Sequence, residues 1–500
     1  MRNIKILYIS LLFLSGFSFQ GCELAEELDD YEPLYALDAE TAINNEETAE
    51  LALTGIYATF RQKSSGGAFP EMFIIPDILS GKAQVSASYA TRPEYAGWIN
   101  NAPLEVNATN QGRIYAGLYD LVNRANWVIE KVGELSDEAF VTEGRREGII
   151  GEARILRALA DFYLLRNFGQ FYDVNSEYGI NLRDEPVRSE TAMPRNTVSE
   201  TYESILADLD AGIEMAPELR AKYYVNKTFA RGLKARVLLY KGDYAAAAEV
   251  ASQTIDLLTS DFQLESDYTS IFGDHESEAI FDTSEILFGT RGESNAGIGI
   301  GNYYSGFFAA ITQSYIDEVS AIFTVNGQDI TIDENRIPAI MNTNTSYGGY
   351  WTSKYTSYFS SGSYEIFIHM RIAEVYLILA ESSARANNAV TPEALEALNA
   401  IRLRAGATPN GGDGFVTYPA TIGYEDFLTA VRKEKLAELQ AEGGESWYDL
   451  IRYDYTDGFG SGFQVVDEKP TATDPDKFIF PIPQESLDVA GGVVIQNPGY

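Results

Sequence analysis

The sequence predicts a mainly α-helical protein, in which a tetratricopeptide-like helical repeat scaffold is interrupted by long irregular, partly β insertions. Two observations predict the scaffold: apolar residues recur at helical spacing over several long segments, and short turns join some of these segments into pairs. A third observation predicts the insertions, because helical periodicity is lost near residues 63–111 and 260–363. We expect residues 41–500 to form one domain, since stacked repeats can extend beyond the usual size of a single core.

The segment Glu147–Phe171 is expected to be an interior helix against which its neighbours pack. It carries two apolar stripes at helical spacing, one with Leu156 and Ala160 and the other with Leu159. A helix that is apolar on two sides needs packing partners on two sides. Gly169 stands where a left-handed C-terminal cap would end the helix.

The other scaffold helices follow the same periodicity, and one of them has a clear start signal. Thr197 and Glu200 have the spacing of a capping box at the start of a helix. Helices are expected at residues 46–62, 112–135, 197–215, 228–241, 243–258, 371–386, 392–404 and 424–442. The tail from 477 to 500 contains three prolines and is expected to be extended rather than helical.

The N-terminus has the features of a lipoprotein leader, predicted to span residues 1–21. Basic residues precede an apolar run over 6–19, which is short for a membrane-spanning helix but suits a signal-peptide core. The run ends beside Cys22, the only cysteine, in a sequence that resembles a bacterial lipoprotein cleavage box. We expect Cys22 to carry the lipid and residues 22–40 to form an acidic tether to the membrane.

Composition excludes several classes of function. The chain has 73 acidic and 37 basic residues, a net charge of −36, so a nucleic acid would be repelled and a neutral ligand is favoured. A single cysteine excludes an internal disulfide, and only His275 and His369 could serve a histidine-dependent nucleophile or a zinc site. His369 precedes an apolar helix and is expected to be structural. We expect neither catalysis nor a cofactor or metal site, although the many carboxylates leave calcium open.

Four short motifs occur in order along most of the chain, and together they resemble the SusD/RagB-like family of outer-membrane nutrient-binding lipoproteins. The motifs lie in the segments Gly151–Gly169, Arg371–Arg404, Val431–Arg452 and Phe480–Tyr500. Two departures from the family pattern are visible: Lys435 stands where arginine is frequent, and the stretch before Trp447 is one residue longer than usual. Both departures concern local geometry more than function.

The resemblance implies a cell-surface protein that captures a glycan and delivers it to a partner, a SusC-like TonB-dependent barrel in the outer membrane. An oligosaccharide is favoured because sugars stack apolar C–H faces on aromatic rings and present hydroxyls to polar side chains. A RagB-like peptide-binding lipoprotein is the alternative. A glycoside hydrolase is a weaker one, because abundant carboxylates on an acidic surface do not define a catalytic pair.

The ligand site is expected where the two insertions meet. Trp127 and Trp447 fall in helical or apolar motifs and are expected in the core, which leaves Trp98 and Trp351, one in each insertion. We expect at least one of these two to stack on a sugar ring. Their expected hydrogen-bonding neighbours are Arg92, Asn100, Asn101 and Tyr350.

Overall fold

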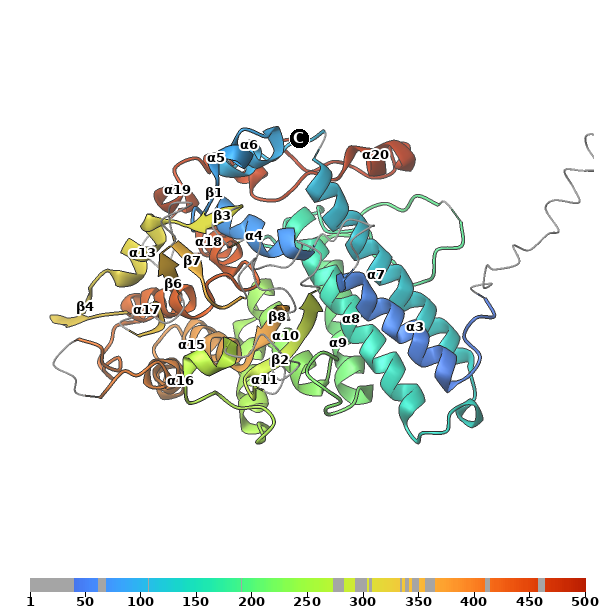
Figure 1. Ribbon diagram of the computed structural model, residues 1–500, viewed down its shortest axis with the longest axis horizontal. Coiled ribbons are helices and arrows are strands. Elements are labelled where there is room, and N and C mark those ends of the chain that lie inside the picture. Colours follow the sequence, from blue (N-terminus) through green and yellow to red (C-terminus); the bar gives the residue numbers. More distant parts are fainter. Residues whose placement is uncertain are drawn as a thin grey trace, which may run out of the picture.

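The computed structural model describes residues 40–61, 69–106, 108–189, 191–272, 283–292, 304, 308–332, 335–337, 341–343, 350–355, 365–409, 414–456 and 464–500. The leader, Cys22, most of the tether and His275 lie outside these ranges. Long helices gather at one end of the molecule, and the short strands and the segments between them gather at the other (Figure 1). No helix of the described part is both long and apolar enough to cross a membrane.

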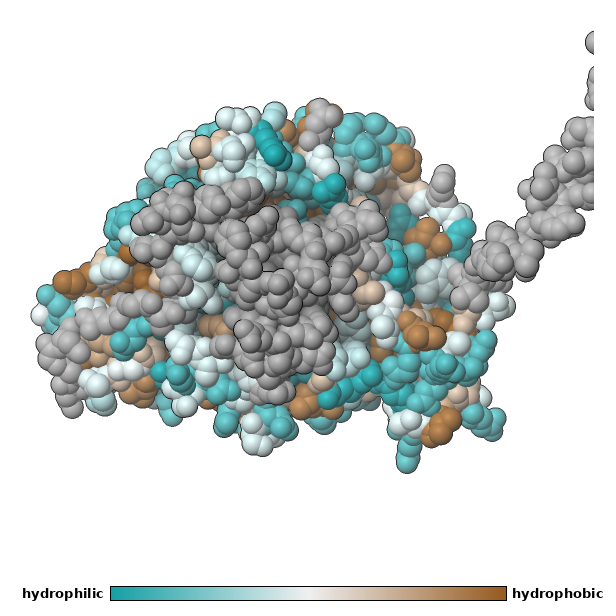
Figure 2. Space-filling view, viewed as in Figure 1, coloured by the Kyte–Doolittle hydropathy of each residue, from teal (hydrophilic) through white to brown (hydrophobic). Residues whose placement is uncertain are grey.

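The scaffold consists of helices that pack against their neighbours along the chain, which confirms the predicted fold class. α8 packs between α7 and α9, α3 packs on α7 and α8, and a second row runs from α10 through α11 and α15 to α16. The bounds are α3 (Glu46–Ala58), α7 (Thr109–Glu134), α8 (Arg145–Phe168), α9 (Val198–Met215), α10 (Lys227–Lys241), α11 (Tyr244–Asp256), α15 (Ile372–Asn387) and α16 (Pro392–Arg404). On the face seen in Figure 2, the described part of the surface is largely hydrophilic, and apolar side chains are scattered over it.

α8 is the interior helix that its two apolar stripes predict. From Gly148 to Phe168 every residue except Arg154 is buried. α9 approaches closely because both helices carry glycine at the contact: a Cβ at Gly212 would lie 2.4 Å from Ile155 Cγ1. The predicted left-handed cap is wrong, since Gly169 has φ −118°. Glycine is needed there for space, because a Cβ would meet Leu165 Cδ1 at 2.8 Å.

Local signals in the sequence explain where the helices begin and end. Thr197 and Glu200 form the predicted capping box of α9. α10 ends at Gly242, which has φ +83°, and Asp243 then caps α11 by accepting from the Ala246 N–H. The tight turn folds α11 back onto α10, as the tetratricopeptide-like spacing predicts.

Two stretches expected to be irregular contain helices. In the first insertion, α4 (Phe69–Leu79) lacks amphipathic periodicity because its described side chains are buried on every side. In the tail, α20 (Gln484–Ala490) starts directly after Pro483 and has Gly491 as its C-cap, so the prolines precede a helix instead of excluding one.

Further helices are α5 (Ala87–Ala90), α6 (Pro93–Ile99), α13 (Gln313–Ser320), α17 (Tyr424–Glu438), α18 (Glu445–Thr456) and α19 (Val465–Glu468).

In the part of the chain that the structure describes, the strands form three small antiparallel sheets. One sheet has the order β1-β3-β7-β6, and the others pair β2 with β8 and β4 with β5. The bounds are β1 (Ala83–Val85), β2 (Ile286–Gly292), β3 (Ala309–Ile311), β4 (Phe323–Val325), β5 (Gln328–Ile330), β6 (Met341–Thr343), β7 (Tyr350–Thr352) and β8 (Glu365–Arg371).

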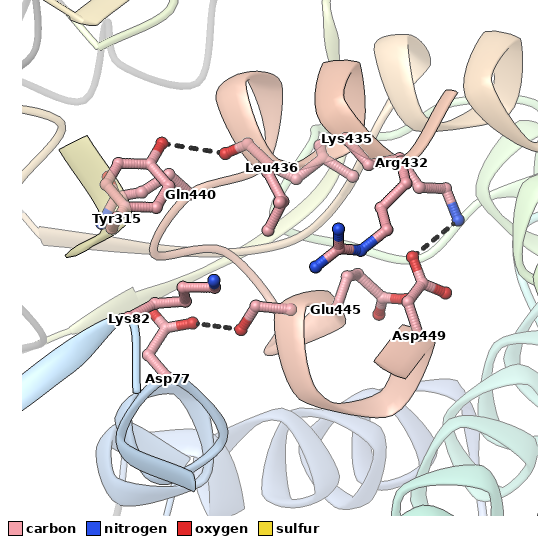
Figure 3. A pocket seen from close by; sticks show the side chains of 11 residues that line it. Asp77, Lys82, Tyr315, Arg432, Lys435, Leu436, Gln440, Glu445 and Asp449 are labelled. Atoms are coloured by element: carbon pink, nitrogen blue, oxygen red, sulfur yellow. Dashed lines mark hydrogen bonds and ion pairs between the residues drawn. The ribbon is translucent and has the colours of Figure 1, made fainter. Parts of the chain in front are cut away.

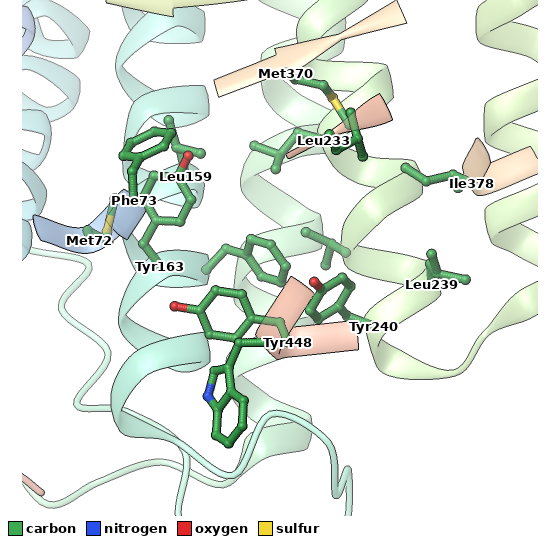
Figure 4. Packing of buried hydrophobic residues seen from close by; sticks show 14 of the residues in the cluster. Met72, Phe73, Leu159, Tyr163, Leu233, Leu239, Tyr240, Met370, Ile378 and Tyr448 are labelled. Carbon is green, nitrogen blue, oxygen red and sulfur yellow. The ribbon is translucent and has the colours of Figure 1, made fainter. Parts of the chain in front are cut away.

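Aromatic side chains from distant segments fill the core between the scaffold and the other half of the molecule. Phe73 of α4, Tyr163 of α8, Tyr240 of α10 and Tyr448 of α18 all belong to this cluster (Figure 4). His369 is buried here: its Nδ1 lies 2.8 Å from the Tyr163 hydroxyl and its Nε2 lies 3.0 Å from the Thr290 hydroxyl. Burial lowers the pKa of His369 to about 3, which fits the expected structural role.

A buried network of ion pairs, here called the arginine cluster, joins the second sheet to α16 and α17. Arg371 at the end of β8 bonds Glu285, Glu438 and Glu442, and none of these side chains is more than 5% exposed. Burial alone would raise the pKa of Glu438, but Arg404, Arg371 and Arg336 together lower it well below its usual range. The cluster comprises Glu285, Arg336, Arg371, Arg402, Arg404, Glu434, Glu438 and Glu442.

Candidate ligand face

The two insertions meet in the four-stranded sheet. β1 of the first insertion pairs with β3 of the second, with Ala83 opposite Ile311 and Val85 opposite Ala309. The pairing continues at both ends of β1, because Thr312 N donates to Lys82 O at 3.0 Å and Ser86 N donates to Phe308 O at 2.8 Å. Segments more than 200 residues apart therefore share one surface, which we call the ligand face.

Aromatic side chains line this junction. Phe308 lies edge-on to Tyr89 and Tyr95, with ring centroids 4.9 and 5.2 Å apart respectively. The guanidinium carbon of Arg92 lies 4.4 Å from the Tyr89 ring centroid, and the Arg92 side chain is exposed. Arg92 has no hydrogen bond or ion pair with any described residue. The junction thus presents the half-buried rings of Tyr89 and Tyr95 beside the solvent-facing donor Arg92, as a carbohydrate-binding surface would.

A charge cluster around the buried Lys82, with partly buried partners, fixes the ligand face to the scaffold. Lys82, next to β1, bonds Glu318 of α13 and Glu468 of α19. Arg432 of α17 reaches the same two carboxylates. Burial lowers the pKa of Lys82, and the charge of Glu318 only partly offsets this effect. Four segments distant in sequence are therefore held together by charges that water screens little.

The cavity beside this cluster is too small to bind a sugar. Lys82, Arg432 and Asp77 line a space of about 20 Å³, into which the Lys82 and Arg432 side chains point (Figure 3). Asp77 accepts from the Ser446 hydroxyl at 2.6 Å and from the Tyr304 hydroxyl. A space of this size holds about one water molecule. We assign the cavity to the structure of the face and not to ligand binding.

Trp98 does not present a stacking surface. Its side chain is 0% exposed and lies edge-on to Tyr95 at 4.9 Å. With the Gln111 amide oriented to satisfy both partners, Oε1 accepts from the Trp98 indole at 3.0 Å and the amide nitrogen donates to Leu104 O at 3.1 Å. Trp98 is therefore a core residue. The sequence places it in an insertion, but it belongs to α6, which packs against α4.

Asn101 is also structural. It is 4% exposed and adopts a left-handed conformation with φ +51°, which asparagine tolerates better than most residues. Its Nδ2 donates to Leu79 O at 2.9 Å, and its Oδ1 accepts from the Thr471 hydroxyl at 2.6 Å. Asn100 is exposed, and its Nδ2 donates to Ala96 O of its own helix at 2.8 Å.

Tyr350 and Trp351 are neighbours in β7, so their side chains point to opposite faces of the sheet. Tyr350 pairs with Ile311 and shares the face of that buried residue, and its hydroxyl donates to Gln313 at 2.9 Å. Trp351 is half-buried, and its indole N–H has no hydrogen-bond partner among the described residues. The two residues therefore cannot form one platform.

The face of the sheet that carries Trp351 also carries residues that sequence reasoning missed. Gln84 and Ala310 pair across β1 and β3 on this face, where Gln84 is exposed and Ala310 is buried. A three-residue strand is too short for its alternation to be detected in the sequence.

The two tryptophans outside the insertions differ in burial. Trp447 is buried, whereas Trp127 is half-buried, with the Arg188 guanidinium carbon 4.7 Å from its ring centroid.

Comparisons with known proteins agree on the family of this fold. A family model described as "SusD family" matches residues 308–500, and another described as "Starch-binding associating with outer membrane" matches residues 74–239. A curated "SusD-like protein" of Bacteroides ovatus is 29% identical over 210 residues, which are 40% of this chain and 36% of that protein. The match thus spans little more than a third of the relative's length.

Solved structures show the same fold over almost the whole chain. A SusD superfamily protein of Bacteroides thetaiotaomicron has a TM-score of 0.73 and 20% identity, covering 91% of this chain and 100% of that one. A structure described as "Laminarin binding SusD-like protein" has a TM-score of 0.70 and 18% identity, with coverages of 92% and 100%. "Surface glycan-binding protein A" of Bacteroides uniformis has a TM-score of 0.70 and 21% identity, with coverages of 91% and 99%.

Proposed function

Because this chain belongs to the SusD/RagB-like family, we propose that it is a non-catalytic, lipid-anchored outer-membrane protein that binds an oligosaccharide. Its partner would be a SusC-like TonB-dependent barrel, to which it delivers the glycan. The observation that carries the proposal is the sheet that joins the two insertions into one aromatic-lined ligand face. Two structural neighbours that are described as laminarin-binding and glycan-binding support this class of ligand.

Within the ligand face, we assign the stacking contact to Trp351. It is half-buried, and it lies on the side of the sheet that carries the exposed Gln84. A half-buried indole offers apolar area without the full loss of side-chain entropy that an exposed flexible residue would bring. Arg92 and Asn100, whose side chains are exposed, stay as proposed hydrogen-bonding residues. Tyr350 points to the opposite face of the sheet from Trp351 and is not proposed to share its ligand contact.

The membrane anchor rests on the sequence and on the family. Cys22 lies outside the described residues, and its lipidation is inferred from the leader that precedes it. The family model described as associating with the outer membrane supports this location. The docking surface for the barrel is proposed on the scaffold helices.

A glycan-array screen of a soluble form, residues 23–500, tests the proposal. We expect binding to a defined set of neutral oligosaccharides and no release of reducing sugar from them. Binding to peptides with no glycan bound would favour the RagB-like alternative. Hydrolysis of a bound glycan by purified protein would contradict the assignment as a binding protein.

A further inference from the structure

A second hollow lies away from the ligand face, between the N-terminal end of α7 and the C-terminal tail. In Figure 1 this is the region where α20 lies beside the start of α7. The groove has a volume of about 520 Å³, within the usual range for a small-molecule site. Its lining comes from the start of α7 and the residues just before it, and from the tail at the start of α20.

Small and rigid residues leave the floor of this groove open. Ala108, Gly112 and Ala116 follow one another at four-residue spacing, so they lie along one line of α7. Pro481 and Pro483 line the groove from the tail. A Cβ built on Gly112 would have no heavy atom within 4 Å, so the space above the helix is free.

Hydrogen-bonding side chains line the groove on both sides. Thr109 and Arg113 come from α7, and Gln484, Glu485 and Ser486 come from the start of α20. The side chains of Thr109, Arg113 and Glu485 make no hydrogen bond or ion pair with the described residues, so they are available to a ligand. The lining carries one guanidinium, from Arg113, and two carboxylates, from Glu105 and Glu485, and this negative balance disfavours an anionic ligand.

One wall of the groove, at the start of α7, is held in place by hydrogen bonds. Gln111, only 1% exposed, bonds both the Trp98 indole and Leu104 O. The start of α7 is fixed by Glu94, whose carboxylate accepts from Asn110 N at 2.8 Å and from Gln111 N at 3.3 Å. A groove with fixed walls needs little ordering when it binds a ligand.

We propose that this groove is a second binding site for a neutral oligosaccharide, an inference that rests on the proposed function. A flat floor of alanine, glycine and proline suits the C–H face of sugar rings, and the polar residues suit their hydroxyl groups. A peptide would need a free strand edge or deep side-chain pockets, and two helix ends with small side chains offer neither. The site would let the protein hold a long glycan at two points, which raises overall affinity without new contacts at the ligand face.

Gly112→Phe tests the groove, because a Cβ at this position meets no heavy atom within 4 Å and the ring would extend over the groove floor. Gly133→Phe is the matched control: it lies in the same helix, a Cβ there also meets nothing within 4 Å, and it does not line the groove. The probes are neutral hexasaccharides from starch, laminarin, mannan and xylan, titrated singly and counted by native mass spectrometry. We expect two bound per wild-type chain, two for Gly133→Phe and one for Gly112→Phe, with a tenfold or greater loss of affinity at the missing site.

The other outcomes separate the two proposals. One hexasaccharide bound per chain, unaffected by Gly112→Phe, would overturn the groove and leave the proposed function standing. If Gly112→Phe binds one hexasaccharide fewer than the wild-type chain and Trp351→Ala binds as many as the wild-type chain, the result would support the groove site and contradict the ligand-face site. Failure of every probe to bind the wild-type chain would overturn both.

Discussion

Arg371 and Arg92 are both arginines beside aromatic rings, and they show how the scaffold differs from the ligand face. Arg371 lies 5.6 Å from the Phe272 ring centroid, is 1% exposed, and is bonded by three carboxylates. Arg92 lies over Tyr89 and faces solvent with no ion pair among the described residues. A guanidinium that is fully satisfied stabilises a fold, whereas one left open to water is available to a ligand.

The largest effect is expected from a charge inside the scaffold. Ala160→Glu places an unpaired carboxylate at a 1% exposed position of α8, which costs several kcal/mol against a total stability of about 5–15 kcal/mol. Leu156→Asp, at a position with no exposure, should have the same result. We expect both variants to fail to fold, as judged by circular dichroism. Leu51→Glu, at an exposed site on α3, should melt like wild type; cooperative wild-type melting of Ala160→Glu would show that α8 is not interior.

Arg371→Ala should lower the free energy of unfolding by somewhat less, but still by a large amount. It removes one cationic partner from each of the buried Glu285, Glu438 and Glu442, and removing one member of a buried ion pair costs about 3–5 kcal/mol. Urea denaturation would measure the change. The control is Arg188→Ala, which breaks exposed ion pairs with Glu40 and Glu130 and should leave the midpoint near that of wild type. Equal midpoints for the two variants would contradict the difference drawn between buried and exposed arginines.

A pH-dependent effect is expected at Asp161 in α8. Burial raises the pKa of Asp161 from its ordinary 3.8 to about 8, although Arg157 acts in the opposite direction. As the pH rises, Asp161 therefore ionises at a lower pH in the unfolded chain than in the folded protein. The free energy of unfolding consequently falls as the pH rises from about 4 to 8. Asp161→Asn removes this dependence, so the variant should gain in Tm relative to wild type over that range. A gap in Tm that stays constant between these pH values would refute the assignment.

The smallest effect on the fold is expected at Cys22. Cys22→Ala should leave melting of the folded part unchanged but release the protein from the outer membrane, because the anchor is a lipid outside the domain. Fatty-acid labelling of cells checks this, with the wild-type chain as the control. Label retained on the variant would exclude Cys22 as the acceptor, since the chain has no other cysteine.

The scaffold could be predicted from the sequence because its signals are local and periodic. Leu156 and Ala160 recur at helical spacing, and Thr197 with Glu200 marks a helix start within four residues. Such patterns can be recognised in the sequence without knowledge of the rest of the fold. The arginine cluster could not be predicted in this way, because its partners, such as Glu285 and Arg371, lie 86 residues apart.

The ligand face was harder to predict for a physical reason. Trp98 lies in a short helix that is buried, and the sequence does not distinguish a buried aromatic from an exposed one without periodicity. Asn101 looked like a ligand donor, but its left-handed backbone and its bond to Leu79 O explain it fully. α4 was missed because a helix buried on all sides has no polar stripe.

The central claim is that the sheet joining the two insertions carries the glycan site, and Trp351 tests it most directly. Isothermal titration of Trp351→Ala with the glycan identified on the array should show affinity reduced about thirtyfold, a loss of about 2 kcal/mol, with unchanged melting. Trp127→Ala is the matched control, because it removes another half-buried tryptophan from a scaffold helix away from the sheet. Wild-type affinity in Trp351→Ala would contradict the claim and place the site elsewhere on the molecule.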